Sequence, residues 1–340
     1  MATLARIFLA FALIITPLQG EVFVHAESAT STASTSAPVS EQQGKWYRSE
    51  RIDGNIQVGD FVVGPGRAEI TVSPGETIIQ EVSVTNRISK NRTFNLDVED
   101  ITGSADGSAA VSLTDGQRGP YSIKDYVSFP EKSFTLDLGE RARIPVKITI
   151  PADAEPGGFY GSVLVSTDRT PDQQDTGVSR SPIIARIGSL LFVRVRGQAE
   201  ISGQTKSIST VDNKWWYEKG PVNLGISYEN TGAVHVNPYG EVSVKNMFGE
   251  EVGFVQLDPW FVLPKSLRTR EFQWDREFLF GRYTVTAKIN RGYDDKIDTV
   301  STSFWVLPWK MVTGAFVILF IIIFILRTFF RNFEFSRKKK

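Results

Sequence analysis

Residues 143–150 read RIPVKITI, and their pattern sets the expectation for most of the chain. Successive side chains of a β-strand point to opposite faces, so apolar residues at every second position gather on one face. The apolar positions in this stretch are Ile144, Val146, Ile148 and Ile150. The stretch therefore predicts a strand that buries one face and exposes the other.

The same period-two pattern recurs on both sides of that stretch. Its apolar positions are Ile78, Val82 and Val84; Phe94, Leu96 and Val98; Val163 and Val165; Val193 and Val195; Leu224, Ile226 and Tyr228; Val242 and Val244; and Tyr283, Val285 and Ala287. Glycine- and proline-containing turns such as Ser73-Pro74-Gly75 and Pro156-Gly157-Gly158 separate these segments. Short alternating strands with frequent turn signals are typical of antiparallel sandwiches. We therefore predict a mainly β protein.

An internal repeat divides this β region into two. Both halves contain a proline before a strand, an asparagine at the end of that strand and a later Gly-x-Tyr: Pro74, Asn86 and Tyr160, then Pro221, Asn230 and Tyr283. In Ig-like sandwiches a tyrosine near such a corner bonds back to the backbone while its ring packs in the core. We predict two tandem Ig-like antiparallel β-sandwiches, residues 46–198 and 199–306, with Tyr160 and Tyr283 as corner residues.

The N-terminal residues have the pattern of a secretory signal. Arg6 precedes an uncharged apolar run over residues 7–15, and Val24-His25-Ala26 has small residues where signal peptidases cleave. We predict a signal peptide over residues 1–26; an uncleaved anchor is the alternative, although the apolar run is short for a span. Residues 27–45 form a Ser/Thr-rich, disordered leader. The polar stretch 168–182 is predicted to be a loop before the last strand of the first sandwich.

The C-terminus contains the strongest signal in the sequence. Residues 311–326 read MVTGAFVILFIIIFIL, and flanking apolar residues extend the run to about 20 residues, enough for a helix to cross a bilayer. We predict a transmembrane helix over residues 307–330 and a basic cytoplasmic tail over residues 331–340. The residues predicted to lie at the membrane interfaces are Trp305, Trp309, Lys310, Arg327 and Arg331.

The charge distribution supports one orientation. The chain holds 38 Lys+Arg and 38 Asp+Glu; residues 1–26 hold one of each, and residues 306–340 hold seven basic and one acidic residue. Residues 27–305 therefore hold 30 basic and 36 acidic residues. Positive charge next to a span stays on the cytoplasmic side. We predict a single-pass protein of the cell membrane with its C-terminus inside and the bulk of the chain extracytoplasmic.

Several chemistries are excluded or disfavoured by composition. The chain has no Cys, so disulfides and thiolate metal sites are ruled out; with two His, a multi-histidine metal site is nearly excluded, and no nucleophile or phosphate-loop motif occurs. The carboxylates of Asp97, Glu99, Asp100 and Asp106 lack the spacing of a calcium loop, so we interpret them as a solvated strand face and a turn. We predict no enzyme activity, catalytic residue, metal, cofactor or small-molecule substrate. Basic residues interspersed with acidic ones also disfavour nucleic-acid binding.

Two aromatic clusters are the candidate binding residues. Trp215, Trp216 and Tyr217 are consecutive, so they cannot all face one side of a strand, and at least one is expected to be exposed. Exposed Trp and Tyr side chains stack on sugars or anchor protein partners, whereas packing against an edge is the alternative. Trp260 and Phe261 are interpreted as a core strand first and a docking surface second.

The sequence also resembles a known family. The segments that carry the resemblance are Pro74-Gly75-Glu76, Val84-Thr85-Asn86, Ile150-Pro151, Pro156-Gly157-Gly158-Phe159-Tyr160-Gly161, Tyr228-Glu229-Asn230-Thr231-Gly232 and Asn237-Pro238-Tyr239-Gly240. These segments are similar to those of the WxL-interacting proteins of bacterial surfaces. That resemblance implies a membrane-anchored surface protein whose first Ig-like module is linked to peptidoglycan and whose second is linked to host-protein binding.

Three functional hypotheses follow. The first is a non-enzymatic surface protein that binds a cell-wall polymer or another surface or host protein. The second is an assembly or chaperone-like component that offers a strand edge to secreted subunits, which an exposed edge free of proline and inward charge favours. The third, a surface carbohydrate hydrolase, requires a deep cleft with two close carboxylates.

Overall fold

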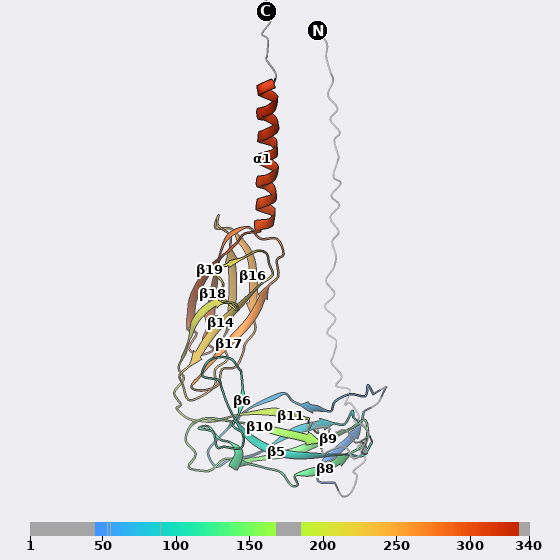
Figure 1. Cartoon of the computed structure of the whole chain (residues 1–340). Helices are drawn as coiled ribbons and strands as arrows, with labels where there is room; N and C mark the ends of the chain where they lie inside the picture. The colour runs from blue at the N-terminus through green and yellow to red at the C-terminus, as the bar shows by residue number, and fades with distance from the viewer. Residues whose placement is uncertain (1–44, 53, 55, 89, 168–184, 333–340) are drawn as a thin grey trace, which may run out of the picture. The chain divides into compact units, whose positions relative to one another are not determined.

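The computed structural model describes residues 45–52, 54, 56–88, 90–167 and 185–332 of the 340-residue chain. The predicted signal peptide, almost all of the leader, the loop at 168–182 and most of the basic tail lie outside these residues. The described part is mainly β, with one long helix at its C-terminal end (Figure 1). It consists of two Ig-like antiparallel β-sandwiches followed by that helix, as predicted.

One sheet of the first sandwich is built around the RIPVKITI stretch. Its strand order is β1-β9-β4-β2, and β7 also pairs with β9. Strands β4 and β9 are antiparallel, with Ile78 opposite Ile148 and Val82 opposite Ile144. The bounds are Arg48–Arg51 for β1, Val62–Gly64 for β2, Thr77–Thr85 for β4, Val127–Ser128 for β7 and Glu140–Thr149 for β9.

The facing sheet has the order β3-β11-β10-β5-β6, with β8 pairing β5. Strand β3 runs parallel to β11 and the other pairs are antiparallel. The bounds are Arg67–Val72 for β3, Arg92–Thr102 for β5, Ser112–Leu113 for β6, Ser133–Leu136 for β8, Gly157–Thr167 for β10 and Arg186–Val195 for β11; a short 3₁₀ helix, η1, spans Lys124–Tyr126.

The core of the first sandwich lies between these sheets and uses the alternating positions. Ile144, Val146 and Ile148 are completely buried, and they contact Phe94, Val163 and other apolar side chains of the facing sheet in one cluster. Each fully buried aliphatic side chain contributes roughly 1.5–3 kcal/mol relative to exposure. The period-two pattern thus translates directly into a two-layer core.

The second sandwich is smaller. A three-stranded sheet has the order β12-β14-β17, and a five-stranded sheet has the order β13-β19-β18-β15-β16. Leu224, Ile226 and Tyr228 of the first sheet are completely buried together with Val242, Val285 and other residues of the second. The bounds are Gly203–Thr210 for β12, Trp216–Tyr217 for β13, Val222–Asn230 for β14, Tyr239–Lys245 for β15, Glu251–Leu257 for β16, Ser266–Trp274 for β17, Gly281–Asn290 for β18 and Ile297–Val306 for β19.

The repeated asparagines have a shared structural role. Asn86 and Asn230 are completely buried at the ends of β4 and β14. The Asn86 amide donates to the Leu136 carbonyl, and its side-chain oxygen accepts from the Ile88 N–H. The Asn230 amide donates to the Val234 and Val262 carbonyls, and its oxygen accepts from the Gly232 N–H. Each asparagine therefore satisfies backbone groups where the chain leaves a strand inside the core.

The single helix, α1, spans Trp309–Asn332. It is the one helix among the described residues that is long and apolar enough to cross a membrane, and its apolar stretch is not buried against the described part of the chain. An α-helix pairs its backbone groups within its own segment, so α1 can satisfy its backbone in a lipid environment. The chain therefore carries a potential membrane anchor at this end.

The carboxylates at the end of β5 differ from expectation. Glu99 and Asp100 were predicted to lie on a solvated strand face, but both are buried. Asp100 accepts from the backbone N–H groups of Gly119, Ile123 and Lys124. Strand alternation fails there because a loop folds over the strand end and uses the carboxylate to satisfy its own backbone.

Candidate functional site

The open edge of β16 is the first candidate binding surface. β16 pairs with β15 on one side and is the last strand of its sheet. The Val252 carbonyl accepts a hydrogen bond from the Arg276 guanidinium at 3.1 Å, so this carbonyl points away from β15. Backbone groups of alternate residues share a side of a strand, so Phe254 and Gln256 present their N–H and C=O groups to the open side.

Side chains along this edge offer little protection against pairing. The one charged residue of β16, Glu251, stands at its start, and the strand has no proline. Phe254 is 55% exposed. A register shift near Lys245 is confined to the turn end, so pairing with β15 is regular from Gly253 to Leu257. An exposed, uncharged edge of this kind is a template for an added strand.

The edge strands β1, β12 and β17 are defended against such pairing. β1 carries three charged residues among its four, Arg48, Glu50 and Arg51. β12 has a bulge between Thr205 and Ser207 and carries Lys206. β17 carries Arg268, Arg270 and Glu271. Charge, bulges and short length are the usual means by which proteins prevent edge pairing, and β16 lacks them over its central residues.

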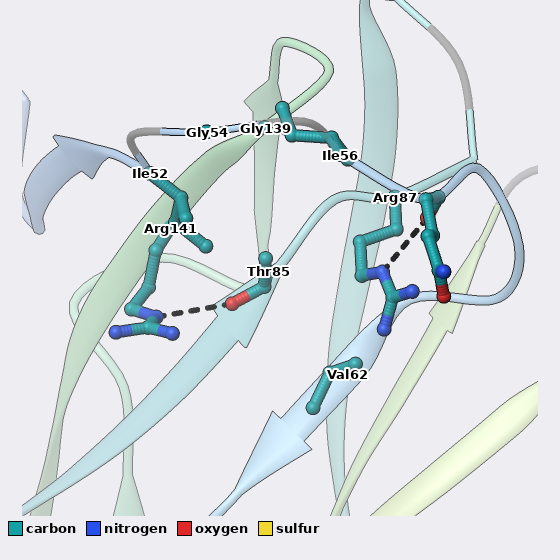
Figure 2. Close-up of a pocket in the computed structure, with 9 residues that line it drawn as sticks. Ile52, Gly54, Ile56, Val62, Thr85, Arg87, Gly139 and Arg141 are labelled. Atoms are coloured by element: carbon teal, nitrogen blue, oxygen red, sulfur yellow. Dashed lines mark hydrogen bonds between the residues drawn. The ribbon is translucent and has the colours of Figure 1, made fainter.

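A pocket on the first sandwich is the second candidate. It has a volume of about 450 Å³ and lies where the segment between β1 and β2 crosses the ends of β4 and β9 (Figure 2). Ile52, Ile56 and Val62 supply apolar walls, and Arg87 and Arg141 supply charge. Figure 2 shows both guanidinium groups on the same side of the crossing segment, with Thr85 between them.

The two arginines differ in how they are held. The Arg141 Nε donates to the Thr85 hydroxyl at 3.1 Å, and its NH1 lies 3.3 Å from a Glu50 oxygen. The Arg87 Nε donates to the Gln57 carbonyl at 3.0 Å, and no carboxylate of the described residues lies within salt-bridge distance of this guanidinium. The planar donors of an arginine suit a carboxylate or phosphate group. The pocket can therefore accept an anionic group with apolar neighbours.

The predicted aromatic contacts fall into two classes. Trp215 is 71% exposed and Trp216 is also exposed, whereas Tyr217 packs against Phe304 with ring centroids 5.7 Å apart. Trp260, only 2% exposed, belongs to the core of the second sandwich, which confirms the first interpretation and leaves no docking surface at this residue.

Phe261 is also enclosed within the molecule. It is half-buried, and its ring packs against Phe192 with centroids 5.0 Å apart and against the Arg268 guanidinium, 4.2 Å from its centroid. Because Phe192 and Arg268 pack against its ring, Phe261 contributes to a contact between residues of the two sandwiches and not to an open docking surface.

The two predicted corner tyrosines differ. The Tyr283 hydroxyl donates to the Phe280 carbonyl and accepts from the Phe280 N–H, so it bonds back to the backbone three residues upstream. The Tyr160 hydroxyl instead accepts from the His235 N–H at 2.6 Å and lies 3.1 Å from the His235 Nδ1. Tyr160 is thus a link to the second sandwich, which a local corner motif does not reveal.

His235 is enclosed by charged and aromatic groups. Its Nε2 lies 3.7 Å from a Glu69 oxygen, and the Phe192 ring packs against it. Burial lowers the pKa of His235 below its ordinary value, and this outweighs the opposing effect of Glu69. Burial also raises the pKa of Tyr160, so the phenol stays protonated beside Nδ1. The arrangement satisfies His235 structurally and contains no nucleophile beside it.

The residues predicted at the membrane interface lie where β19 passes into α1. Trp305 is in β19, and Trp309 and Lys310 begin the helix; both tryptophans are exposed. The Lys310 ammonium lies 2.9 Å from a Glu218 oxygen. Arg327 and Arg331 lie in the last turns of the helix. Over the described residues, no group of three His, Asp or Glu side chains gathers into a potential metal site.

Comparisons with known proteins return distant structural likenesses. No protein-family model matches the chain, and no curated protein matches it. The class 5 fimbrial chaperone CfaA is 14% identical, with 73% of this chain and 100% of that chain covered and a TM-score of 0.35. The E. coli chaperone DraB is 14% identical (73% and 98% covered, TM-score 0.32), and a CsuC-CsuE chaperone–tip adhesion subunit complex of Acinetobacter baumannii is 11% identical (71% and 98%, TM-score 0.34). Likenesses at this level do not decide what this chain binds.

Proposed function

We propose that this chain is a non-enzymatic, membrane-anchored protein that binds an extended segment of another protein by strand addition to β16. The observation that carries the proposal is the open edge of β16: within the described residues no strand pairs with the outer side of Phe254 or Gln256, and neither residue is charged. A peptide adding to such an edge gains main-chain hydrogen bonds, and the exposed Phe254 ring offers a side-chain contact. This is the assembly or chaperone-like role.

The proposed location is the outer side of the cell membrane. Helix α1 is the anchor, and the basic residues that follow it remain on the cytoplasmic side. Both sandwiches then project outward, where secreted or surface proteins are the available partners. The resemblance to WxL-interacting proteins, which rests on turn and strand motifs, is consistent with this location and with a protein partner.

Site-specific crosslinking tests the proposal. A photoreactive amino acid at position 256, on the open side of β16, is expected to trap one discrete partner in cell membranes. The same group at position 288, on the central strand β18, serves as the control. The partner is identified by mass spectrometry, and the crosslinked peptide is expected to be an extended stretch of its chain.

A pair of substitutions separates strand addition from ordinary side-chain contact. Phe254→Pro removes the outward N–H without removing a donor to β15, whereas Phe254→Ala keeps the N–H and removes only the ring. We expect Phe254→Pro to abolish the crosslink and Phe254→Ala to weaken it. Equal crosslinking in Phe254→Pro and the parent would refute strand addition.

A second candidate function is favoured by the pocket on the first sandwich. The Arg87 guanidinium, free of a carboxylate partner within the described residues, suits a carboxylate of a cell-wall polymer. We expect Arg87→Gln to weaken cosedimentation of the full chain with purified wall sacculi about tenfold, the size of one charge-assisted contact. Arg143→Gln is the matched control, because the Arg143 guanidinium already pairs with Glu50 at 3.1 Å. Equal binding by both variants would exclude this role for the pocket.

A further inference from the structure

Exposed apolar side chains gather at one end of the second sandwich. They come from separate loops and strand ends and are Trp215, Trp216, Met247, Phe248, Phe278, Phe280, Trp305 and Leu307. We call this set the apolar rim. Phe248 is 79% exposed, and Phe278 is 65% exposed. Single exposed apolar residues need no explanation, but a gathered set marks an interaction surface.

Strand register places these residues at one end. Gly281 at the start of β18 is opposite Val306 at the end of β19, and Lys245 at the end of β15 is opposite Thr284. The loop from β17 to β18, which carries Phe278 and Phe280, therefore lies at the end where β19 finishes. The β15–β16 turn lies there too, because a Cβ on Gly281 would come within 2.7 Å of the Met247 sulfur.

The tryptophans belong to the same end. β13 pairs in parallel with the last residues of β19, with Trp216 opposite Trp305. The Trp305 N–H donates to the Trp215 carbonyl, and the Leu307 N–H donates to the Tyr217 carbonyl. Strand pairing thus places residues of three loops and of the final strand at the same end of the second sandwich.

The connection from this end to the helix is short. Two residues, Leu307 and Pro308, separate β19 from α1, and each residue spans at most about 3.6 Å. The Met311 N–H already donates to the Pro308 carbonyl, so the helix starts at once. If α1 spans a bilayer, its first turn lies at the interface, and the end of β19 is held within a few ångströms of the headgroup layer.

Charge decides which kind of surface fits the rim. Acidic residues (Glu218, Glu250, Asp275 and Glu277) are interleaved with basic ones (Lys214, Lys219, Arg276 and Lys310) around it. The rim therefore has no strong net charge that would favour anionic lipid. Its tryptophan and phenylalanine side chains are the types that prefer the boundary between headgroups and acyl chains. Continuity with the span favours the lipid interface over a protein as the occupant.

We propose that the apolar rim inserts into the outer interface of the membrane that α1 spans, so that the second sandwich rests on the lipid surface. The inference rests on the membrane anchoring proposed above and is independent of strand addition at β16. The proposal also assigns Trp215 and Trp216 a different role, because they then contact lipid and not a carbohydrate or a protein partner.

Depth-dependent quenching tests the proposal on the full chain in phosphatidylcholine vesicles. The chain has no cysteine, so Glu277→Cys, beside Phe278, and Asp258→Cys, at the opposite end of β16, each accept one fluorescent label. Both positions are exposed. We expect lipids spin-labelled in the headgroup or high on the acyl chain to quench the label at position 277 at least severalfold more than the label at position 258.

Substitution of the rim supplies the second measurement. Phe278→Ser with Phe280→Ser, made in the Glu277→Cys chain, is expected to reduce quenching to the level of the position 258 control, while α1 keeps the protein in the vesicles. Both phenylalanines are exposed, so a circular dichroism melt should match the parent.

Two outcomes would overturn the proposal. Equal quenching at positions 277 and 258 would show that the rim does not reach lipid. A label at position 277 that reports an apolar surrounding without being quenched by lipid would show that a protein covers the rim. If α1 did not span the vesicle, neither label would be quenched and the chain would be extracted by alkaline carbonate, which separates failure of the anchor from failure of the rim.

Discussion

Asn86 and Asn230 close the strand ends of the two sandwiches in the same way. Each is completely buried and makes hydrogen bonds only to backbone groups in the contacts described above. An alanine at either position removes an amide donor from backbone carbonyls at the strand end, and a buried group left unsatisfied costs about 1–3 kcal/mol. The two halves of the internal repeat therefore share the strand pattern and also a buried asparagine that hydrogen-bonds to backbone groups.

We expect Asn230→Ala to lower the free energy of unfolding of the second sandwich by about 1–3 kcal/mol, because the buried Val234 carbonyl loses the amide donor, and the Val262 carbonyl and the Gly232 N–H each lose one of two partners. Urea unfolding of the full chain in detergent, followed by tryptophan fluorescence, measures the change. The control is Asn223→Ala on the exposed face of β14, which should change stability by less than about 0.5 kcal/mol. Similar losses in both variants would contradict the assigned role.

The pKa of His235 predicts a pH dependence of stability. The groups facing the ring are Glu69, Arg67, Arg194 and Tyr160, and burial together with the arginines holds the pKa below its ordinary value. The unfolded chain then binds a proton more readily than the folded chain, so this contribution to stability is present above the unfolded pKa and is lost as pH falls.

We expect the thermal midpoint of the parent chain to fall more steeply than that of His235→Gln between about pH 7 and about pH 5, the range in which histidine ordinarily titrates. Differential scanning fluorimetry at a series of pH values provides the comparison. His235→Gln should start from a lower midpoint at neutral pH, because the Tyr160 hydroxyl loses its ring partner. Parallel pH profiles for the two proteins would rule out His235 as the titrating group.

At the scale of elements, β16 is held against the rest of its sandwich by close approach. A Cβ on Gly253 would lie 2.3 Å from the Trp274 Nε1, so β16 lies directly over the end of β17 at this point. Trp274 is buried among Tyr283 and Phe304 and has little room to move. The absence of a side chain at Gly253 therefore positions the open edge.

We expect Gly253→Ala to destabilise the second sandwich by about 1–3 kcal/mol, the usual cost of forcing extra volume into a packed site. Gly66→Ala is the matched control, since a Cβ there meets nothing within 4 Å and its φ is not in the left-handed region. Chemical denaturation of both variants decides the matter. If Gly253→Ala were as stable as Gly66→Ala, the Trp274 side chain could move aside at little cost, and the prediction would be wrong.

At the scale of the whole molecule, the two ends of α1 define a topology. The proposed arrangement places both sandwiches outside and the residues after Asn332 inside. Asp258→Cys should react with a membrane-impermeant maleimide on intact cells, whereas Ser336→Cys should react only after the membrane is permeabilised. Labelling in the opposite order would reverse the orientation and remove the outer surface as the site of binding.

The fold was largely predictable, because alternation is a local property. Ile144, Val146 and Ile148 point into the core for the same reason that they alternate in sequence, and residues 311–326 form a helix whose apolar character is visible without any contact. Local reasoning failed at Glu99 and Asp100, where a loop distant in the chain covers the strand. At Trp260 the first interpretation, a core strand residue, is confirmed by its burial in the second sandwich.

The candidate sites were much less predictable. Trp215 and Trp216 were recognisable as exposed aromatics, but their place beside Phe248, Phe278 and the end of β19 depends on strand pairing between residues far apart in sequence. The open edge of β16 is a property of strand order, and the bond from Tyr160 to His235 joins the two sandwiches.

The amino-acid sequence by itself determined the mainly β character, the two-fold repeat and the apolar helix, since periodicity and hydrophobicity act over neighbouring residues. Only the tertiary structure decided which strand stays unpaired, which carboxylates are buried and which aromatic side chains share one surface. These features depend on contacts between residues distant along the chain. Strand pairing, hydrogen bonds and burial form only when folding brings those residues together.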